Sequence, residues 1–242
     1  MKNPRSNRTA AAGLCLSFAM MVMPSIVRAD DAKEVDRVKE AGNVIKELVN
    51  SSNGVPTDLL NKAECVIILP SVKKAGFIVG ASYGRGVMSC RSGENFDGPW
   101  STPTMMQSTG GSFGLQAGGQ ATDFVILVMN DKGARALMKG KLKLGGDASV
   151  AAGPVGRDAE ASTNASMSAE MLSYSRAQGV FAGVSLAGAT LGPDNGANKS
   201  LYGKDLTAEE IIQKGAVKPP ASASELLSVL EEKSPKNVSA GK

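Results

Sequence analysis

The pentapeptide Gly80-Ala-Ser-Tyr-Gly84 contains the residues of this chain that are most able to do covalent chemistry. It matches the G-x-S-x-G pattern of a nucleophilic serine, which needs a strand, a sharp turn, a following helix and a histidine partner. Strand-like sequence continues after Gly84, however, and none of the 242 residues is a histidine. This excludes catalysis by Ser-His-Asp or Cys-His groups. A dyad of Ser82 with Lys73 or Lys74 is the nucleophilic arrangement that remains, and we predict a protein that is not an enzyme.

The acidic and the glycine-rich segments show no pattern typical of a metal or cofactor site. The acids are scattered among predicted strands and turns without the spacing of a calcium loop; they are Asp123, Asp147, Asp158, Glu160 and Asp194. The stretches GGSFGLQAGGQ and GRG lack the lysine and hydroxyl of a phosphate-binding loop and the helix of a dinucleotide-binding motif. We interpret these glycines as relieving crowding in a curved sheet, and we predict neither a metal nor a cofactor.

Lysines offer the other candidate chemistry, which is the binding of anions. Lys73 and Lys74 lie in an apolar stretch, and Lys139, Lys141 and Lys143 alternate along a predicted strand. Alternation would place the last three ammonium groups on one face of that strand. Such a face is either a solvated edge that guards against aggregation or a patch for lipid phosphates.

The first 29 residues have the layout of a secretory signal. A basic start precedes an apolar run over residues 10–23, and small residues precede a cleavage site after Ala29. Lipid attachment at Cys15 is the weaker interpretation, because Leu14 stands where a small residue is expected. We therefore predict an exported protein, in the periplasm or outside the cell and peripheral on a membrane, whose mature part is large enough for one domain with a core.

Removal of this segment balances the charge of the chain. The leader contains four basic residues and no acid, so the mature chain has 23 basic and 23 acidic residues. A balanced chain has no general positive field that attracts nucleic acid, and we predict no nucleic-acid partner. Any anionic partner must then bind at local clusters of basic residues.

Two cysteines remain after the leader, Cys65 and Cys90, and both lie in strand-like sequence. In an oxidising compartment they form a disulfide, while two buried thiols are the alternative. The sequence leaves both open.

The segment from Ala32 to Val49 has the apolar spacing of one helix, with acids and bases mixed on its other face. The ordinary interpretation is a helix that packs on a core. The alternative is a helix that lies on a membrane surface, which favours a basic face with few acids.

Strands and further helices follow. ECVIILP, which Pro70 closes, and ATDFVILVMN read as buried strands, and AGFIVGASYGRGVMSCR alternates. Asp131 is predicted to cap a short helix, and capping boxes at Thr207 to Glu210 and Ser222 to Glu225 introduce two more.

This order of elements predicts an α+β fold. We expect a curved antiparallel β-sheet or partly closed barrel, with N- and C-terminal helices packed on it. A single domain is predicted over residues 30–232, and residues 233–242 are predicted to form a flexible C-terminal tail.

Several long motifs together resemble the SYLF domain family. They are PSVKKAGFIVGASYGRGV at 70–87, GPVGRDAEA at 153–161, LSYSRAQGVFAGVSLAGATL at 172–191 and DNGANKSLYG at 194–203. The likeness covers residues 32–232, and the chain looks like a bacterial, exported, single-domain member. The resemblance implies a lipid-binding module: eukaryotic members bind phosphoinositides, remodel membranes and, in fungal forms, bind and bundle actin, often beside an SH3 or FYVE domain.

The family's membrane contact involves an N-terminal amphipathic helix and nearby basic residues. The resemblance transfers this role to the apolar stripe of Val35, Val38 and Ile45 and to basic residues beside it. The resulting lipid-binding candidates, with the two lysines after Pro70, are Lys33, Arg37, Lys39, Lys46, Lys73 and Lys74.

The tripeptide YSR resembles a signature of the family, yet no catalytic partner lies near it in the sequence. We interpret Tyr174 and Arg176 as structural polar anchors at the start of a strand, with surface recognition as the second interpretation. Their hydroxyl and guanidinium would satisfy buried backbone or carboxylate groups, among them Asp158 or Glu160.

These observations favour one function and leave a rival. The first is a non-enzymatic protein of the bacterial cell envelope that binds anionic phospholipid surfaces through the helix and local lysines. The alternative is an envelope scaffold that binds protein partners through sheet edges or loops.

Overall fold

A computed structural model describes residues 29–52, 54–76, 79–113, 120–155, 168–177 and 180–239. The predicted signal segment, except Ala29, lies outside these residues, and so do Asp158 and Glu160. The side chain of Lys74 is likewise outside the described part.

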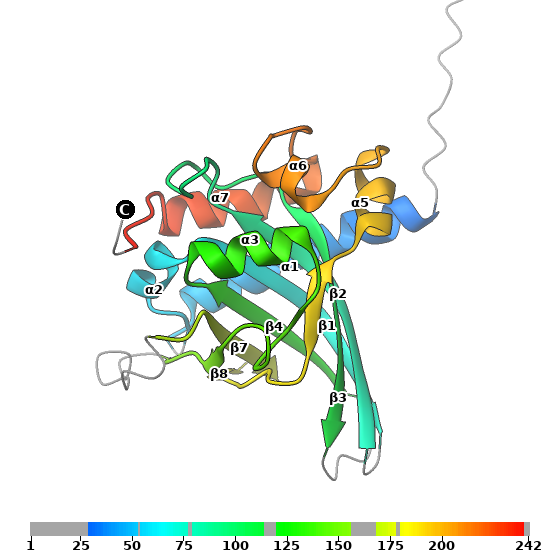
Figure 1. Ribbon diagram of the computed structural model, residues 1–242, viewed down its shortest axis with the longest axis vertical. Coiled ribbons are helices and arrows are strands. Elements are labelled where there is room, and N and C mark those ends of the chain that lie inside the picture. The colour runs from blue at the N-terminus through cyan, green and yellow to red at the C-terminus, as the bar shows by residue number, and fades with distance from the viewer. Residues whose placement is uncertain are drawn as a thin grey trace, which may run out of the picture.

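One curled sheet of nine strands organises the molecule (Figure 1). Its order is β5-β9-β3-β2-β1-β4-β7-β6, with β8 also paired to β7, and every pairing is antiparallel except that of β6 with β7. The strands are β1 Cys65–Gly76, β2 Val79–Cys90, β3 Thr104–Phe113, β4 Gln120–Val128, β5 Leu142–Lys143, β6 Val150–Ala152, β7 Met171–Ala177, β8 Val180–Gly183 and β9 Thr190–Pro193.

The two ends of the sheet come close to each other. Strands β5 and β6 lie at opposite ends of the strand order, yet they are consecutive in the chain and are joined by a short turn in which Leu144 and Ala148 form a bridge. A turn this short holds both ends together, so the sheet curls into a partly closed barrel. The predicted α+β fold is confirmed.

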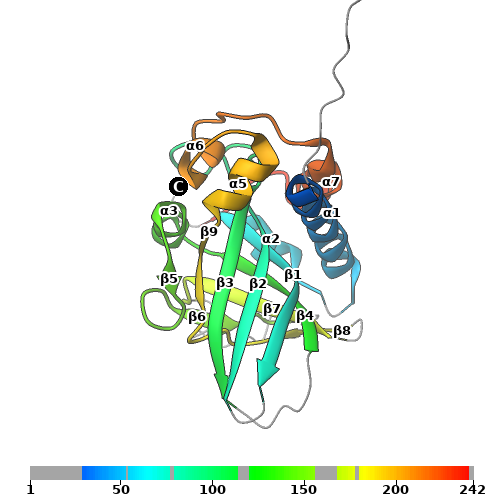
Figure 2. The same ribbon diagram turned by 90° about the vertical axis from the view of Figure 1, so that its right-hand side faces the viewer.

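Helices cover both faces of the sheet. Figure 2 shows α1 (Ala29–Asn50) and α7 (Ser224–Lys233) on one side, and α3 (Asp131–Lys139) on the other. The remaining helices are α2 (Thr57–Lys62), α5 (Asn195–Tyr202), α6 (Ala208–Ile212) and the short 3-10 turn η2 (Ala221–Ala223).

Two hydrophobic clusters result, one on each face of the central strands. On β1, Val66 and Ile68 pack into the cluster with α1, α2 and α7, while Ile67 and Leu69 pack into the cluster with α3 and α6. Because both faces are covered, this strand is apolar at successive positions and shows no alternation.

Pro70 does not end β1, and that part of the prediction is wrong. The register with β4 shifts between Leu69 and Val72, where Ser71 has a φ of 52°. Proline is tolerated within a sheet at such a bulge, because the ladder of hydrogen bonds is already interrupted there. Asp123 on β4 stabilises the bulge by accepting a hydrogen bond of 2.8 Å from the Ser71 N–H.

The glycines of GRG relieve crowding, as interpreted from the sequence. A Cβ atom at Gly86 would overlap the carbonyl oxygen of Ile68, and one at Gly84 would lie 2.5 Å from a methyl carbon of Val72. Both glycines are therefore required by the close approach of β1, and neither serves a phosphate loop.

The predicted row of three lysines on one strand face is also wrong. Lys139 is the last residue of α3, and β5 contains only Leu142 and Lys143. Burial of Leu137 and Met138 keeps the helix regular up to Lys139. Asn130 caps this helix, because its side chain accepts a hydrogen bond from the Gly133 N–H, whereas Asp131 is the first helical residue.

The two predicted capping boxes have different outcomes. Thr207 and Glu210 form the box at the start of α6, as predicted. Ser222, however, lies inside η2, and the N-cap of α7 is Ala223 without any side-chain hydrogen bond. The 3-10 turn moves Ser222 away from the cap position, so the second box does not form.

Residues after α7, which the sequence assigns to a flexible tail, contact the domain as far as Val238, whose N–H donates to the carbonyl of Asn61 at 2.9 Å. Arg91, whose side chain is buried, donates to the backbone oxygen and the hydroxyl of Ser234 at 2.7 Å each and stacks on Trp100. Asn237 donates to Glu64 at 2.6 Å and to the carbonyl of Phe96 at 2.8 Å. Burial lowers the pKa of Arg91 to about 10, so its guanidinium is still charged at neutral pH.

The structure also pairs the two cysteines of the mature chain. Cys65 on β1 and Cys90 on β2 are direct partners in the strand register and are joined by a disulfide. Among the helices described, none has the length and apolar character needed to cross a membrane.

Candidate functional site

The apolar stripe of α1 packs on the body of the protein. Val38, Ala41, Ile45 and Leu48 have no exposed surface and belong to the cluster shared with β1, β2 and α7. Of the two interpretations of this helix, the structure shows the one in which it packs on a core. Its apolar residues are therefore not a surface that a membrane can meet while the domain is folded.

Ion pairs hold the N-terminal half of α1. Glu34 is 3 % exposed and accepts hydrogen bonds from Arg37 on its own helix and from Arg85 on β2. The other end of the Arg85 guanidinium pairs with Asp194 at 2.8 Å, and Asp194 caps α5 through the Ala197 N–H. Arg37, one of the predicted lipid-binding residues, is therefore used within the fold.

Arg176 holds the C-terminal half of the same helix. Its guanidinium pairs with Asp123 on β4 at 2.6 Å and with Glu47 on α1. It thus joins two strands and a helix, which agrees with the interpretation of Arg176 as a structural anchor. Its partners Asp123 and Glu47 lie far from it in the sequence, while the candidates Asp158 and Glu160 are outside the described residues.

Tyr174 lies in the middle of β7, and its side chain is fully buried against Gly153 and Phe181. Its hydroxyl has no hydrogen-bond partner in the part of the chain that the structure describes. Burial raises the pKa of this phenol well above its usual range, so the hydroxyl stays protonated. Tyr174 therefore contributes packing, and the predicted polar anchoring rests on Arg176.

The predicted lipid-binding residues divide between two regions. Lys33, Arg37, Lys39 and Lys46 lie on α1, whereas Lys73 is exposed on the part of β1 beyond the bulge. Lys39 and Lys46 are seven residues apart and so lie on one side of the helix, facing α7. Glu40 and Glu47 are also seven residues apart in the sequence. They lie on another side of the helix, where Glu47 forms an ion pair with Arg176. The side of α1 that faces α7 therefore carries two lysines, whereas the side of Glu40 and Glu47 also carries Lys33, which stands seven residues before Glu40.

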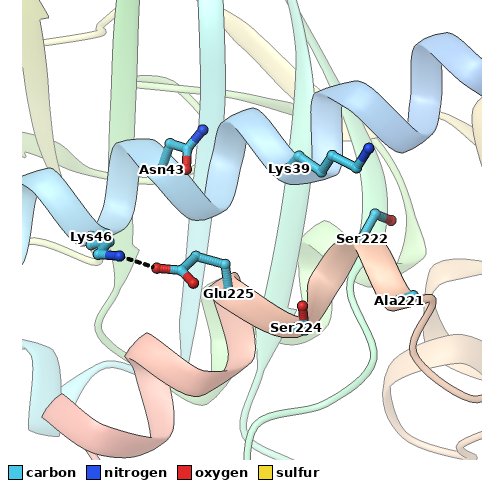
Figure 3. Close-up of a pocket in the computed structure, with 7 residues that line it drawn as sticks. All are labelled: Lys39, Asn43, Lys46, Ala221, Ser222, Ser224 and Glu225. Carbon is cyan, nitrogen blue, oxygen red and sulfur yellow. Dashed lines mark ion pairs between the residues drawn. The ribbon is translucent and has the colours of Figure 1, made fainter.

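Lys39 and Lys46 line an open hollow of about 370 Å³ between α1 and the start of α7 (Figure 3). We refer to it as the α1/α7 hollow. Its lining residues are Lys39, Asn43, Lys46, Ala221, Ser222, Ser224 and Glu225. Lys46 and Glu225 lie at one end, Lys39 and Ser222 lie at the other, and Asn43 lies between them.

The two ends of the α1/α7 hollow differ in electrostatics. Lys46 pairs with Glu225 at 2.7 Å, and the hydrogen bond and charge of Glu225 raise the pKa of Lys46. Lys39 pairs with Asp36 at 3.7 Å, with 60 % and 71 % of the two side chains exposed. An exposed pair at that distance contributes little, so the positive potential of the hollow is concentrated at the Lys39 end.

Sequence analysis missed Asn43, Ser224 and Glu225, which come from two helices almost 180 residues apart in the chain. A signal was present at Ser222 and Glu225, where a serine precedes a glutamate by three residues. It was interpreted as a cap, and only the packing of α7 on α1 shows that both residues line a hollow.

Ser82 is hydrogen-bonded to the backbone of β3, and the side chain of Lys74, one of its candidate partners, lies outside the described part of the structure. Its hydroxyl donates to the carbonyl of Gly110 at 3.3 Å, and the strand register places it opposite Lys74. Among the described residues, no group of three or more potential metal ligands occurs.

Comparison with known proteins agrees with the motifs. Residues 109–233 match the family described as Las17-binding protein actin regulator. An SH3 domain-containing protein of Schizosaccharomyces pombe is 38 % identical over 204 residues, which are 81 % of this chain and 46 % of that protein. The chain belongs to this family, the SYLF family. The residues matched to the family include α7, whereas α1 precedes them.

Two further relatives extend the comparison. LAS seventeen-binding protein 3 of Saccharomyces cerevisiae is 36 % identical over 182 residues, which are 74 % of this chain and 39 % of the relative. SH3 domain-containing YSC84-like protein 1 of Homo sapiens is 36 % identical over 200 residues, which are 80 % of this chain and 57 % of that relative. The chain spans about half the length of the curated relatives it matches. These descriptions name binding and regulatory proteins, and none names an enzyme.

Proposed function

We propose that this SYLF domain is a non-enzymatic binding module for anionic phospholipid surfaces in the bacterial cell envelope. The observation that carries the proposal is the position of Lys39 and Lys46 on one side of α1, where both line an open hollow beside α7. The secretory layout of residues 1–29 supports an exported location, and the balanced charge of the mature chain gives no reason to add a nucleic-acid partner.

The contact is electrostatic in this proposal. The stripe of α1 stays in the core, so the surface meets lysine ammonium groups and helix ends, with no apolar face inserted. Each lysine near an anionic membrane contributes about 1 kcal/mol of attraction, which salt screens over about 10 Å at 0.1 M. Binding should therefore be moderate and should weaken as salt is added.

Flotation of the mature protein with vesicles tests this function. Vesicles of phosphatidylglycerol and phosphatidylcholine are compared at low and at physiological salt. We expect binding only to the anionic vesicles, and a loss of about thirtyfold when Lys39→Gln and Lys46→Gln are combined, from about 2 kcal/mol of lost attraction. The double variant Lys204→Gln and Lys214→Gln is the matched control, since both lysines are exposed and neither lines the hollow. Absence of binding to any vesicle at low salt contradicts the proposal.

Protein binding is the second candidate, and one observation of the fold favours it. Strand β3 pairs with β2 as far as Phe113, but it pairs with β9 only from Met106 to Thr109. In the described structure, the outer edge of the last four residues of β3 is therefore without a neighbouring strand. An edge of this kind can accept a strand from a partner protein.

The relatives give this candidate its context, because one of them is named as a protein that binds Las17. Two results together would establish the scaffold function in place of lipid binding. The protein would float with no vesicle, and a purified envelope partner would bind the wild type and the Lys39→Gln/Lys46→Gln variant equally.

A further inference from the structure

We propose that the C-terminal end of the chain is a latch that controls reduction of the disulfide between Cys65 and Cys90, and that a dithiol is the partner that acts on it. We refer to residues 234–239 as the C-terminal strap and to residues 92–99 as the Phe96 loop. The docked strap holds this loop in place near the disulfide, and release of the strap lets a dithiol reach the sulfur atoms. The latch operates whether or not the domain binds lipid, so it goes beyond the proposed function.

The disulfide is closed off from solvent. Cys65 and Cys90 have no exposed surface, and both belong to the hydrophobic cluster that also contains Phe96. Phe96 is itself completely buried, although the residues on either side of it, Asn95 and Asp97, are exposed. The Phe96 loop is thus a surface turn that sends one ring into the cluster that holds the cross-link. A thiolate must contact a sulfur atom to reduce a disulfide, so part of this cover has to move first.

The backbone of Phe96 has a conformation that depends on its surroundings. Its φ of 54° lies in the left-handed region, which is unfavourable for a bulky aromatic residue and persists only when other contacts impose it. Two such contacts are present. The guanidinium of Arg135 on α3 lies over the ring at 5.2 Å, and the Phe96 carbonyl accepts a hydrogen bond of 2.8 Å from Asn237 of the strap. Loss of the strap therefore favours relaxation of the loop, which withdraws the ring.

The strap itself is held by the two residues that adjoin the cysteines. Glu64 precedes the first cysteine, and its carboxylate accepts a hydrogen bond of 2.6 Å from Asn237. Arg91 follows the second cysteine and donates twice to the first residue of the strap, at 2.7 Å each. Val238 donates to the carbonyl of Asn61, which places the end of the strap beside α2 (Figure 1). Docking of the strap and closure of the disulfide therefore stabilise the same local arrangement of β1 and β2.

Reduction proceeds in two exchanges once the sulfur atoms are accessible. A thiolate of the dithiol attacks one sulfur of the disulfide, and the other sulfur leaves as a thiolate. The second thiol of the reductant then displaces the mixed disulfide. Two electrons and two protons pass to the pair of cysteines, and the dithiol becomes a disulfide. A dithiol protein that shares the compartment is the class of partner that supplies this step.

The coupling between strap and disulfide acts in both directions. Two processes that stabilise one arrangement stabilise each other by the same factor. The docked strap therefore slows reduction, and reduction weakens docking because the cross-link no longer fixes Glu64 next to Arg91. Since Ser234 is also the C-cap of α7, the redox state is transmitted to the helix that borders the α1/α7 hollow.

The first test measures reduction of the native mature protein by dithiothreitol. Samples are alkylated at intervals, and mass spectrometry counts the modified cysteines. Asn237→Ala removes the hydrogen bonds to Phe96 and Glu64 and should raise the rate about tenfold or more, because the rate follows the population of the open state. Lys236→Gln is the matched control within the strap, since Lys236 is exposed, and it should react at the wild-type rate. Equal rates in Asn237→Ala and the wild type would overturn the latch.

Low concentrations of urea distinguish opening of the latch from unfolding of the domain. Local opening exposes little surface, so the rate of reduction should change by less than about twofold per molar urea below the unfolding transition. Reduction through global unfolding would instead rise about tenfold or more per molar urea, because the dependence on urea scales with the surface exposed. A steep rise in both the wild type and Asn237→Ala would overturn the latch.

The second test follows the strap in the absence of the disulfide. Trp100 is the only tryptophan of the chain, and its indole N–H donates to the Ser234 carbonyl at 2.9 Å, so its fluorescence reports docking of the strap. In the reduced wild type and in the Cys65→Ser/Cys90→Ser variant, we expect emission at longer wavelength and about threefold stronger quenching by acrylamide. Circular dichroism checks that both proteins are folded. Quenching equal to that of the oxidised protein, or loss of the whole fold on reduction, would overturn the latch.

Discussion

Replacement of Ile45 by alanine tests whether α1 serves the core or a membrane. The side chain of Ile45 has no exposed surface, and it packs in the cluster that α1 shares with α7 and the central strands. Truncation of a buried isoleucine to alanine costs about 2–5 kcal/mol, from lost transfer free energy and from the cavity left behind. Ile45 is completely buried, and ion pairs fix both halves of its helix, so neighbouring residues have little freedom to close the cavity. We therefore expect Ile45→Ala to lower the free energy of unfolding by about 3–4 kcal/mol.

The size of this effect is large compared with the stability of the whole domain. A typical domain has a free energy of unfolding of about 5–15 kcal/mol, and a loss of 3–4 kcal/mol lowers the melting temperature by roughly 10 °C in a chain of this length. Release of the whole helix would also expose its partners on the sheet, among them Val66, Ile68 and Val87. A membrane could cover the stripe of the helix but not these partners, which is why we expect α1 to remain packed during binding.

The assay combines thermal or urea unfolding with vesicle flotation well below the melting temperature. Ile45→Ala should unfold more easily while its folded form binds vesicles within about twofold of the wild type, since its lysines are unchanged. Val35→Ala is the matched control on the same helix, because Val35 is only partly buried. Unchanged stability together with lost flotation in Ile45→Ala would refute the argument, since it would mean that the stripe meets the membrane.

Three further predictions concern the groups that hold the fold. Arg176→Ala should lower the free energy of unfolding by about 1–3 kcal/mol because it leaves Asp123 without its main partner, and a double-mutant cycle with Asp123→Ala should show coupling; additive effects would contradict the pair. Tyr174→Phe should leave stability unchanged or raise it in urea unfolding, since the lost hydroxyl has no partner among the described residues, whereas Tyr174→Ala should cost about 3–5 kcal/mol; a large loss in Tyr174→Phe would reveal a missing hydrogen bond. Backbone hydrogen bonding from Ser149 lowers the pKa of Glu170 below 4.5, so its contribution is present above that pH and is lost as the pH falls through the lowered pKa. Glu170→Gln should therefore reduce the loss of stability on acidification below the usual pKa of a glutamate, and an unchanged acid profile would count against this assignment.

Much of the fold could be predicted because local patterns agree with it. The spacing of apolar residues on α1, the apolar run of β1 and the capping box at Thr207 each express a requirement that neighbouring residues in the sequence can meet. The absence of histidine removed most catalytic mechanisms by composition alone. Predictions of this kind were correct because they depend on contacts between residues that are close in the sequence or that recur at regular spacing.

Errors occurred where distant segments changed a local preference. Pro70 normally ends a central strand, but a bulge supported by Asp123, more than fifty residues later, lets β1 continue. Ser222 has the spacing of a cap, yet the turn before α7 takes it out of that position. The strand predicted to carry a row of lysines begins later than expected, because burial of the apolar face of α3 prolongs that helix to Lys139.

The candidate site shows the same division. The sequence by itself determined that Lys39 and Lys46 share one side of α1, because a separation of seven residues is close to two helical turns. Only the tertiary structure decided that Glu225 neutralises Lys46 while Ser222 lies beside Lys39, because these contacts depend on how closely α7 packs at Gly42. Charge and hydrogen bonding act through distances of a few ångströms, and residues this far apart in the chain acquire such distances only when the domain has folded.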